Sequence, residues 1–227
     1  PPYIALSRLQ RGRFSPTRFI CRATPARAGP VCSAADKRYP LGRMNEPQIQ
    51  RPALPGSPEK KQESRDAQKV LRLLAGMLKP LGFERTKPTF FTRNGPYVIE
   101  FVHVHKYSFA ASFRVHFGVR VRSDDFPAAG MNGPCADGIP DPESPGRRLH
   151  DFDFTPDAVS WKTCANLMLQ HVANAGLSWF ASVSDPTILL SASSPLTQNA
   201  RLALRREIEF PDSVQVSEAT QRALNAA

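Results

Sequence analysis

Three histidines are the residues whose type and spacing most directly suggest chemistry. His103 and His105 are two positions apart, and His116 follows in the next run of alternating residues. Residues two apart in a strand share a face and lie about 7 Å apart. A turn near 108–110 places His103 opposite Arg114 and makes His116 its diagonal neighbour on the same face. Three imidazoles on one face, with water as a fourth ligand, suit zinc, so one hypothesis is a metal-dependent hydrolase.

The same histidines fit a second interpretation, in which they are polar residues on the less buried face of a sheet. There the imidazoles form hydrogen bonds or contact water. No carboxylate close by in the sequence is placed to orient them as metal ligands. We therefore expect no cofactor, and we keep zinc on His103, His105 and His116 as the alternative.

Another candidate site is a strand face on which cations alternate with aromatic side chains. Its cations are Lys106, Arg114, Arg120 and Arg122, and its aromatic residues are Tyr97, Phe101 and Tyr107. Aromatic side chains among arginines on an open sheet can stack and neutralise single-stranded RNA, which makes RNA binding a hypothesis. The acidic second half of the chain offers these cations internal partners, so an internally paired or solvated face is the competing interpretation.

No recognised catalytic sequence accompanies these candidates. The chain contains no phosphate-binding glycine loop, no nucleophile elbow and no His-Glu-x-x-His sequence. We therefore assign no catalytic residue and expect a protein that is not an enzyme.

A helix and three strands must position these residues. Apolar residues recur at helical spacing over 64–78, and Asn94-Gly95 is a strong hairpin signal. Apolar and polar residues alternate along the last strand, which predicts a β-meander with one face packed on the helix. The expected strands cover 89–93, 97–107 and 111–122.

A Gly- and Pro-rich loop over 123–146 follows, and we expect it to be mobile. Thr155 is the expected N-cap of the next helix, and Gly176 its expected end. The other expected elements are a strand over 148–154, helices over 155–174 and 177–184, helices after Asp185-Pro186 and Ser194-Pro195, a strand over 213–216 and a helix from Ser217 to about Asn225. The predicted class is α+β, with a helix on an antiparallel meander followed by a helical part.

Positive charge is concentrated at the start of the chain. Residues 1–43 carry nine Lys and Arg and a single acid, whereas the whole chain has a net charge of +10. This proline-rich leader is expected to be disordered, and residues 44–62 to continue it as a linker. We consider three hypotheses for it: sequence upstream of an initiator at Met44, an organellar transit peptide, and a basic tail that binds nucleic acid. Residues 63–227 are predicted to form one domain.

The sequence also indicates where in the cell the protein is located. The apolar runs fall far short of the roughly 18 residues that cross a bilayer, so we expect no membrane partner. The four cysteines include no Cys-x-x-Cys pair, which indicates a reduced protein. A cytoplasmic location is therefore expected.

Several segments together resemble a known family. They are Leu78-Lys79-Pro80-Leu81-Gly82-Phe83, Thr89-Phe90-Phe91-Thr92-Arg93, His105-Lys106-Tyr107 and Phe113-Arg114-Val115-His116-Phe117-Gly118-Val119. Their order and spacing are similar to the bacterial domain-of-unknown-function family 4304, over about residues 66–122 and more loosely to about 191. The family's usual Gln is His105 in this chain, and its usual Asn is His116. The resemblance implies the fold and a bacterial setting, and it supplies no catalytic residue.

These observations favour a non-enzymatic module that binds another macromolecule, most readily a protein. Nucleic acid is a possible but less favoured partner, and the metal-dependent hydrolase and the RNA-binding sheet face are the alternatives. The residues expected to form the binding surface are His103, His105, His116, Arg114, Arg120 and Arg122.

Overall fold

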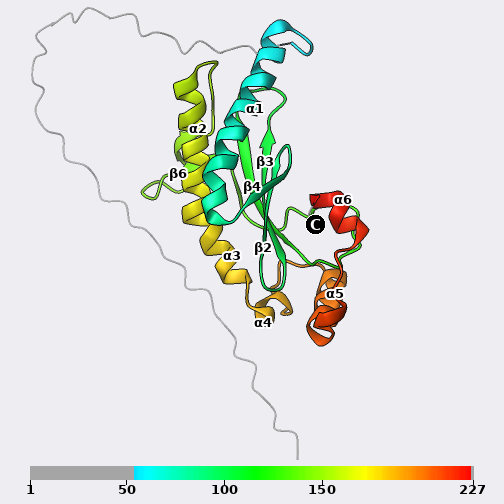
Figure 1. Ribbon diagram of the computed structural model, residues 1–227. Coiled ribbons are helices and arrows are strands. Elements are labelled where there is room, and N and C mark those ends of the chain that lie inside the picture. The colour runs from blue at the N-terminus through cyan, green and yellow to red at the C-terminus, as the bar shows by residue number, and fades with distance from the viewer. Residues whose placement is uncertain (1–53, 226–227) are drawn as a thin grey trace, which may run out of the picture. The chain divides into compact units, whose positions relative to one another are not determined.

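The computed structural model describes residues 54–225, and the leader predicted over 1–43 lies outside them. Within 54–225 the chain is an α+β domain, as predicted, with helices packed on an antiparallel sheet of strand order β1-β2-β3-β4-β5 (Figure 1). A smaller sheet pairs β6 with β7. Among the helices of this part of the chain, none has the length and apolar character that a membrane crossing needs.

The central sheet is the predicted meander with one strand added at each edge. Its strands are β1 (Glu84–Lys87), β2 (Phe90–Asn94), β3 (Ile99–Lys106), β4 (Phe113–Arg120) and β5 (Cys135–Ala136). The sequence does not predict β1, because its residues are polar and lack apolar alternation. β1 forms through its pairing with β2, in which Glu84 lies opposite Thr92.

Part of the loop predicted over 123–146 forms strands. β5 pairs with the outer edge of β4, and β6 (Gly138–Pro140) pairs with β7 (Arg148–Asp151) as a short hairpin. The expectation of a mobile loop is therefore wrong for these strand segments, because their backbone groups are bonded to neighbouring strands.

The first helix, α1 (Pro58–Leu78), begins earlier than predicted. The Ser57 hydroxyl accepts a hydrogen bond from the Lys60 N–H at 3.1 Å, and Pro58 occupies the first helical position. Residues 58–62, which the sequence assigned to a linker, are therefore helical. A short 3-10 turn over Lys79–Leu81 follows, and Gly82 ends it with a left-handed backbone, φ 83°.

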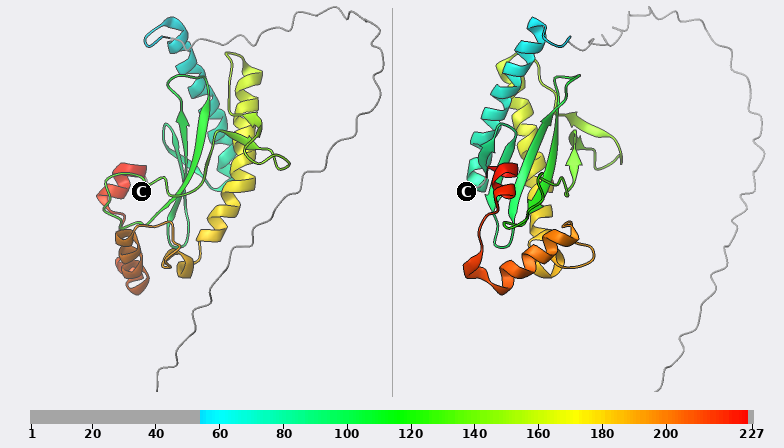
Figure 2. Two further views of the ribbon diagram at one scale, coloured as in Figure 1. Left: turned by 180° about the vertical axis from the view of Figure 1, so that it is seen from behind. Right: turned by 90° about the vertical axis from the view of Figure 1, so that its right-hand side faces the viewer.

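One face of the sheet carries the core. Phe113, Phe117 and Val121 are fully buried, as their alternation predicts. They pack beneath α1 and α2 (Ala158–His171), which lie side by side on this side of the sheet (Figure 2). Burying each such side chain contributes about 1.5–3 kcal/mol, so this layer stabilises the strands that carry the polar residues on the opposite face.

The helix α2 differs from its prediction at both ends. Its N-cap is Asp157 rather than Thr155, because an Asp157 carboxylate oxygen accepts the Ser160 N–H at 2.7 Å. A π-helical turn, Val172–Gly176, joins it without a break to α3 (Leu177–Val183). Gly176 is helical, and a Cβ at this position would come within 2.8 Å of the Phe117 ring. Gly176 therefore serves close packing of the helix on the sheet, and with its helical backbone it does not end the helix.

Two helices and a turn follow. α4 (Pro186–Leu189) begins after Asp185, as predicted. α5 (Gln198–Glu209) is capped by Thr197, whose hydroxyl accepts the Ala200 N–H at 3.2 Å, so the predicted cap at Ser194 is wrong. The strand predicted over 213–216 is also wrong: a 3-10 turn ends at Ser213, and residues 214–216 pair with no strand of the part of the chain that the structure describes.

The last helix, α6 (Glu218–Leu224), starts at Ser217 as predicted and covers part of the second sheet face. Leu224 packs with Phe101 of β3 in a small second core. The Phe101 ring lies over Gly118, its direct partner on β4. The sheet is therefore packed on both faces at this end, and the predicted solvated face is limited to the other end.

Candidate functional site

The candidate site is the part of the second sheet face that α6 leaves uncovered, and we call it the open face. Its side chains come from β2, β3, β4, β5 and the turn after β3. They belong to Phe90, His103, His105, Tyr107, Phe109, Arg114, His116 and Cys135.

The three histidines share this face, as predicted, but in a different register. His103 lies directly opposite His116, and His105 lies opposite Arg114. The prediction placed His103 opposite Arg114. The turn is longer than predicted, because the Tyr107 N–H donates to the Ser112 carbonyl and leaves four residues between them. A register change of two residues keeps every side chain on its face, so the histidines still meet.

A row of side chains crosses four strands at one level, and we call it the imidazole row. Phe90 lies opposite His103, His103 opposite His116, and His116 opposite Cys135. The ring centroids are 4.4 Å apart for Phe90 and His103, and 5.8 Å apart for the two histidines. Directly opposed residues have Cβ atoms about 4.5–5.5 Å apart, which brings the exposed Cys135 thiol beside the His116 ring.

A second line of rings runs along β3 from this row into the hairpin turn. The centroids of His103 and His105 are 6.3 Å apart, and those of His105 and Tyr107 are 5.7 Å apart. Tyr107 and Phe109 follow at 4.9 Å. Phe109 is 62% exposed, so the open face ends in an aromatic side chain that lies largely in solvent.

The imidazole row is uncharged at neutral pH. Burial, followed by the nearby His116 and His105, lowers the pKa of His103 to about 4. Burial also lowers the pKa of His116, and the neighbouring Arg114 and His105 add to the effect. In addition, Nδ1 of His103 is buried and has no hydrogen-bond partner within residues 54–225. The two rings therefore contribute apolar surface and neutral hydrogen-bonding groups rather than positive charge.

The geometry does not support the three-histidine zinc site that the sequence suggested. Zinc requires each ligating nitrogen to lie about 2.0–2.1 Å from a common point. The His103 ring is tilted by 34° to His116 and by 46° to His105, and the ring centroids are 5.8 and 6.3 Å apart. Within residues 54–225, no three His, Cys, Asp or Glu side chains are placed to hold a metal ion. This arrangement lends the zinc alternative no support, and zinc binding by His103, His105 and His116 stays a prediction.

Arg114 lies on the open face, but an internal partner neutralises it. Its guanidinium donates to both Asp137 carboxylate oxygens, at 2.5 and 2.9 Å. The Tyr107 hydroxyl donates to the same carboxylate at 2.5 Å, and Arg148 approaches it at 3.5 Å. The hydrogen bond from Arg114 is the largest of the effects that lower the pKa of Asp137 to about 2. Arg114 and Asp137 thus form a charge-compensated pair.

Arg120 is on the same face but does not belong to the binding surface. It is only 3% exposed, beneath α6 and the segment that follows β4. Its guanidinium donates to the Thr220 hydroxyl at 2.6 Å and to three main-chain carbonyls, those of Asp124, Phe126 and Ala128. The predicted binding role is therefore wrong, because this nearly buried guanidinium is engaged by the segment after β4 and by Thr220 of α6.

The other predicted cations also lie elsewhere. Arg122 follows the end of β4, where it donates to the Gly95 carbonyl at 2.5 Å and faces Glu207 at 3.9 Å. Lys106 points to the helix-covered face and pairs with Glu63 of α1. Of the six predicted binding residues, His103, His105, His116 and Arg114 come together, whereas Arg120 and Arg122 do not.

Cys135 and Asp137 belong to the site, and sequence reasoning missed both. Cys135 lies on β5 and Asp137 directly follows it, because the segment before β5 is bonded to β4. The Asn132 side chain bonds both the N–H and the C=O of Val119, at 3.0 and 2.9 Å. No local sequence pattern marks these long-range contacts, since Asn132 stands in a stretch that reads as a Gly- and Pro-rich loop.

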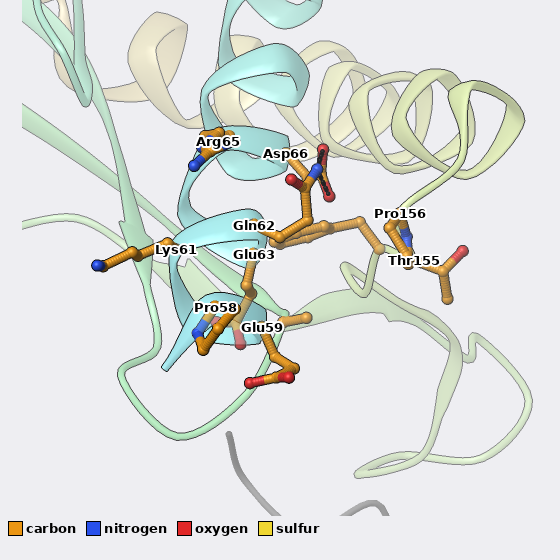
Figure 3. A pocket seen from close by; sticks show the side chains of 11 residues that line it. Pro58, Glu59, Lys61, Gln62, Glu63, Arg65, Asp66, Thr155 and Pro156 are labelled. Carbon is orange, nitrogen blue, oxygen red and sulfur yellow. Dashed lines mark hydrogen bonds between the residues drawn. The ribbon is translucent and has the colours of Figure 1, made fainter. Parts of the chain in front are cut away.

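A separate cavity of about 790 Å³ lies between the first turns of α1 and residues 154–156. Figure 3 shows Gln62 and Asp66 joined by hydrogen bonds, while Lys61 extends away from them. Asp66 is almost completely buried, and it accepts from Gln62 at 3.0 Å and from Lys69 at 3.0 Å. Its carboxylate is thus already compensated within the wall, and the cavity shares none of its lining residues with the open face.

No protein-family model matches the chain, and neither the curated proteins nor the solved structures include a match.

Proposed function

We propose that residues 54–225 form a protein-interaction module that binds its partner through the open face and has no catalytic role. The observation that carries this proposal is the imidazole row, an uncharged line of four side chains that crosses the sheet and continues into the exposed aromatic turn. Clustered aromatic side chains with neutral polar groups are typical of the buried centres of protein interfaces.

The charges of the open face support a protein rather than RNA. Binding to RNA depends on cations that are free to neutralise phosphates. Arg114 is paired with Asp137, and Arg120 is buried by the C-terminal layer. The neutral forms of His103 and His116 add no positive charge at pH 7. The face therefore offers stacking surface without the electrostatic attraction that nucleic acid requires.

The partner that fits this surface presents apolar or aromatic side chains with a few hydrogen-bonding groups and little net charge. Phe109 and Tyr107 project from the hairpin turn and serve as anchors. The exposed His105 ring and the half-buried His116 ring supply polar groups that fix the orientation of the partner. A highly charged partner would lose its hydration here without gaining a counter-ion.

A photo-crosslinking amino acid in place of Phe109, in the full chain and in living cells, tests the proposal. The control places the same group at Val159, which is highly exposed on α2 and lies outside the open face. We expect one discrete protein adduct from position 109 and none from position 159. The captured protein, once purified, should bind the unsubstituted chain at least about tenfold more tightly than the Phe109→Ala variant.

Three results would refute the proposal. They are the absence of an adduct from position 109, equal adducts from both positions, and an adduct that ribonuclease removes. The last result would assign the face to RNA.

Two further proposals accompany this function. Cys135 and Cys164 carry free thiols, which supports a reducing, cytoplasmic location. The order of a helix ending near Gly82, a hairpin and a long returning strand supports membership in the family 4304 to which the sequence is similar. A sequence profile built from newly identified relatives of residues 66–122 would test the family proposal.

A further inference from the structure

A groove runs between α5 and the segment that follows β4. Residues 123–127 form one wall, α5 forms the other, and residues 213–217 contribute the rest of the lining. Its volume is about 1250 Å³. Figure 1 shows α5 near the C-terminal helix, and none of the lining residues belongs to the open face.

Large apolar side chains line this groove and are exposed to solvent. Phe126 is 56% exposed, Leu202 46% and Phe210 62%. Single exposed apolar residues are common, but a cluster of large ones around a hollow marks an interaction surface. Phe126 stands on the loop wall and Leu202 on the helix wall, so a side chain that enters the groove contacts apolar surface on both sides.

The groove also carries charges that its own ion pairs do not compensate. Two lining carboxylates have partners outside the lining: Asp124 pairs with Arg120 and Glu207 pairs with Arg122, each at 3.9 Å. Three other lining residues, Asp125 on the loop wall and Arg206 and Glu209 on the helix wall, take no part in these pairs and are exposed. The loop wall thus presents the Asp125 carboxylate and the helix wall the Arg206 guanidinium together with the Glu209 carboxylate, in a groove that Phe126 and Phe210 also line.

We propose that two copies of this chain associate through the α5 groove around a two-fold axis. A partner that fits the groove must place a cation opposite Asp125, a carboxylate opposite Arg206, and aromatic side chains in the hollow. The groove itself carries a cation, a carboxylate and aromatic side chains. In a two-fold contact, residue i of one copy meets residue j of the other copy, and residue j of the first meets residue i of the second. Asp125 of each copy then pairs with Arg206 of the other, and the exposed phenylalanines of each copy enter the opposite groove.

The mass of the full chain, measured by analytical ultracentrifugation over a wide concentration range, tests the proposal. We expect a reversible monomer–dimer equilibrium. Asp125→Arg and Arg206→Glu should each weaken the dimer at least about tenfold, because each change places like charges in contact twice in the symmetric interface. The double variant, which exchanges the two charges, should recover most of the lost affinity.

Two further variants make the measurement specific. Phe210→Ala should also weaken the dimer, because it removes a large apolar anchor. Arg72→Glu is the matched control: it makes the same charge reversal at an exposed residue of α1 and should leave the dimer unchanged. The circular dichroism spectrum of each variant verifies that it is folded.

A protein that stays monomeric at every concentration would overturn the proposal. A dimer that both single charge reversals leave unchanged, or that the double variant fails to restore, would overturn it equally. Because the groove and the open face share no residue, neither result bears on the crosslinking test at Phe109.

Discussion

Burial of His103 predicts that the domain loses stability in mild acid. The pKa of His103 is about 4 in the folded domain, whereas the ordinary value for histidine is 6.5. Between these pH values the unfolded chain binds a proton that the folded chain does not. The free energy of unfolding therefore falls as the pH is lowered from about 6.5 towards 4, and the neutral ring's contribution is fully present only above this range.

The size of the effect follows from the two pKa values. Each unit between them corresponds to about 1.4 kcal/mol, so the full difference is about 3 kcal/mol. Solvent reaches the half-buried ring and screens its neighbours, which reduces our expectation to about 2 kcal/mol. His116, whose pKa is also lowered, acts in the same direction.

Urea denaturation of the His103→Phe variant and the unsubstituted chain, between about pH 4 and pH 7, measures this contribution. Phenylalanine keeps a ring against Phe90 and cannot take up a proton. All carboxylates are the same in the two proteins, so their titration cancels in the difference. We expect the variant to lose about 2 kcal/mol less than the unsubstituted chain as the pH falls.

His150→Phe is the control, because His150 is exposed on β7 and lies outside the open face. It should lose stability in parallel with the unsubstituted chain. The reasoning fails if His103→Phe also loses stability in parallel with the unsubstituted chain, because His103 would then titrate alike in the folded and unfolded states.

Three other substitutions test the packing around the site. Gly118→Ala should lower the free energy of unfolding by about 1–3 kcal/mol in urea denaturation, because the added Cβ overlaps the Phe101 ring. Gly130→Ala is the control: its Cβ has open space, so the free energy of unfolding should change by less than about 0.5 kcal/mol. Equal costs for the two variants would contradict the packing of Phe101 on Gly118. Arg120→Met should cost about 1–3 kcal/mol, since it removes the donor of the Phe126 and Ala128 carbonyls and of the Thr220 hydroxyl, and an unchanged denaturation midpoint would refute the anchoring role. Asp137→Asn should release Arg114 and raise the salt concentration needed to elute the protein from heparin; an unchanged elution would show that Asp137 does not neutralise that cation.

Local patterns were sufficient for most of the elements. The alternation of Phe113, Phe117 and Val121 predicts a strand with one buried face, and the structure buries all three. The caps at Asp185 and Ser217 also lie where the sequence predicts them. These features depend on neighbouring residues in the chain, so sequence spacing is enough to identify them.

The errors arose where a distant segment decides the outcome. Gly176 has the composition signal of a helix end, but the Phe117 ring requires a glycine there for close packing. Arg120 alternates with apolar residues like an exposed strand residue, yet α6 and the segment after β4 bury it. Neither partner can be inferred from the sequence around the residue concerned.

The candidate site shows the same division. That His103 and His116 share a face could be predicted even though the register was off by two residues, because an even shift preserves the face. Cys135 and Asp137 could not be assigned to the site, since their place depends on the bonding of residues 132–136 to the outer edge of β4.

The sequence by itself determined the α+β class, the meander and the face on which the histidines lie, because side-chain alternation and turn chemistry act within a few residues. Only the tertiary structure decided which cations remain at the surface, and it did so through pairs such as Arg114 with Asp137. Charge and burial depend on whatever packs against a side chain, and that neighbour is usually far away in the chain. The basic strand residues therefore give an open face on which Arg114 is paired with Asp137 and His103 and His116 are neutral at pH 7.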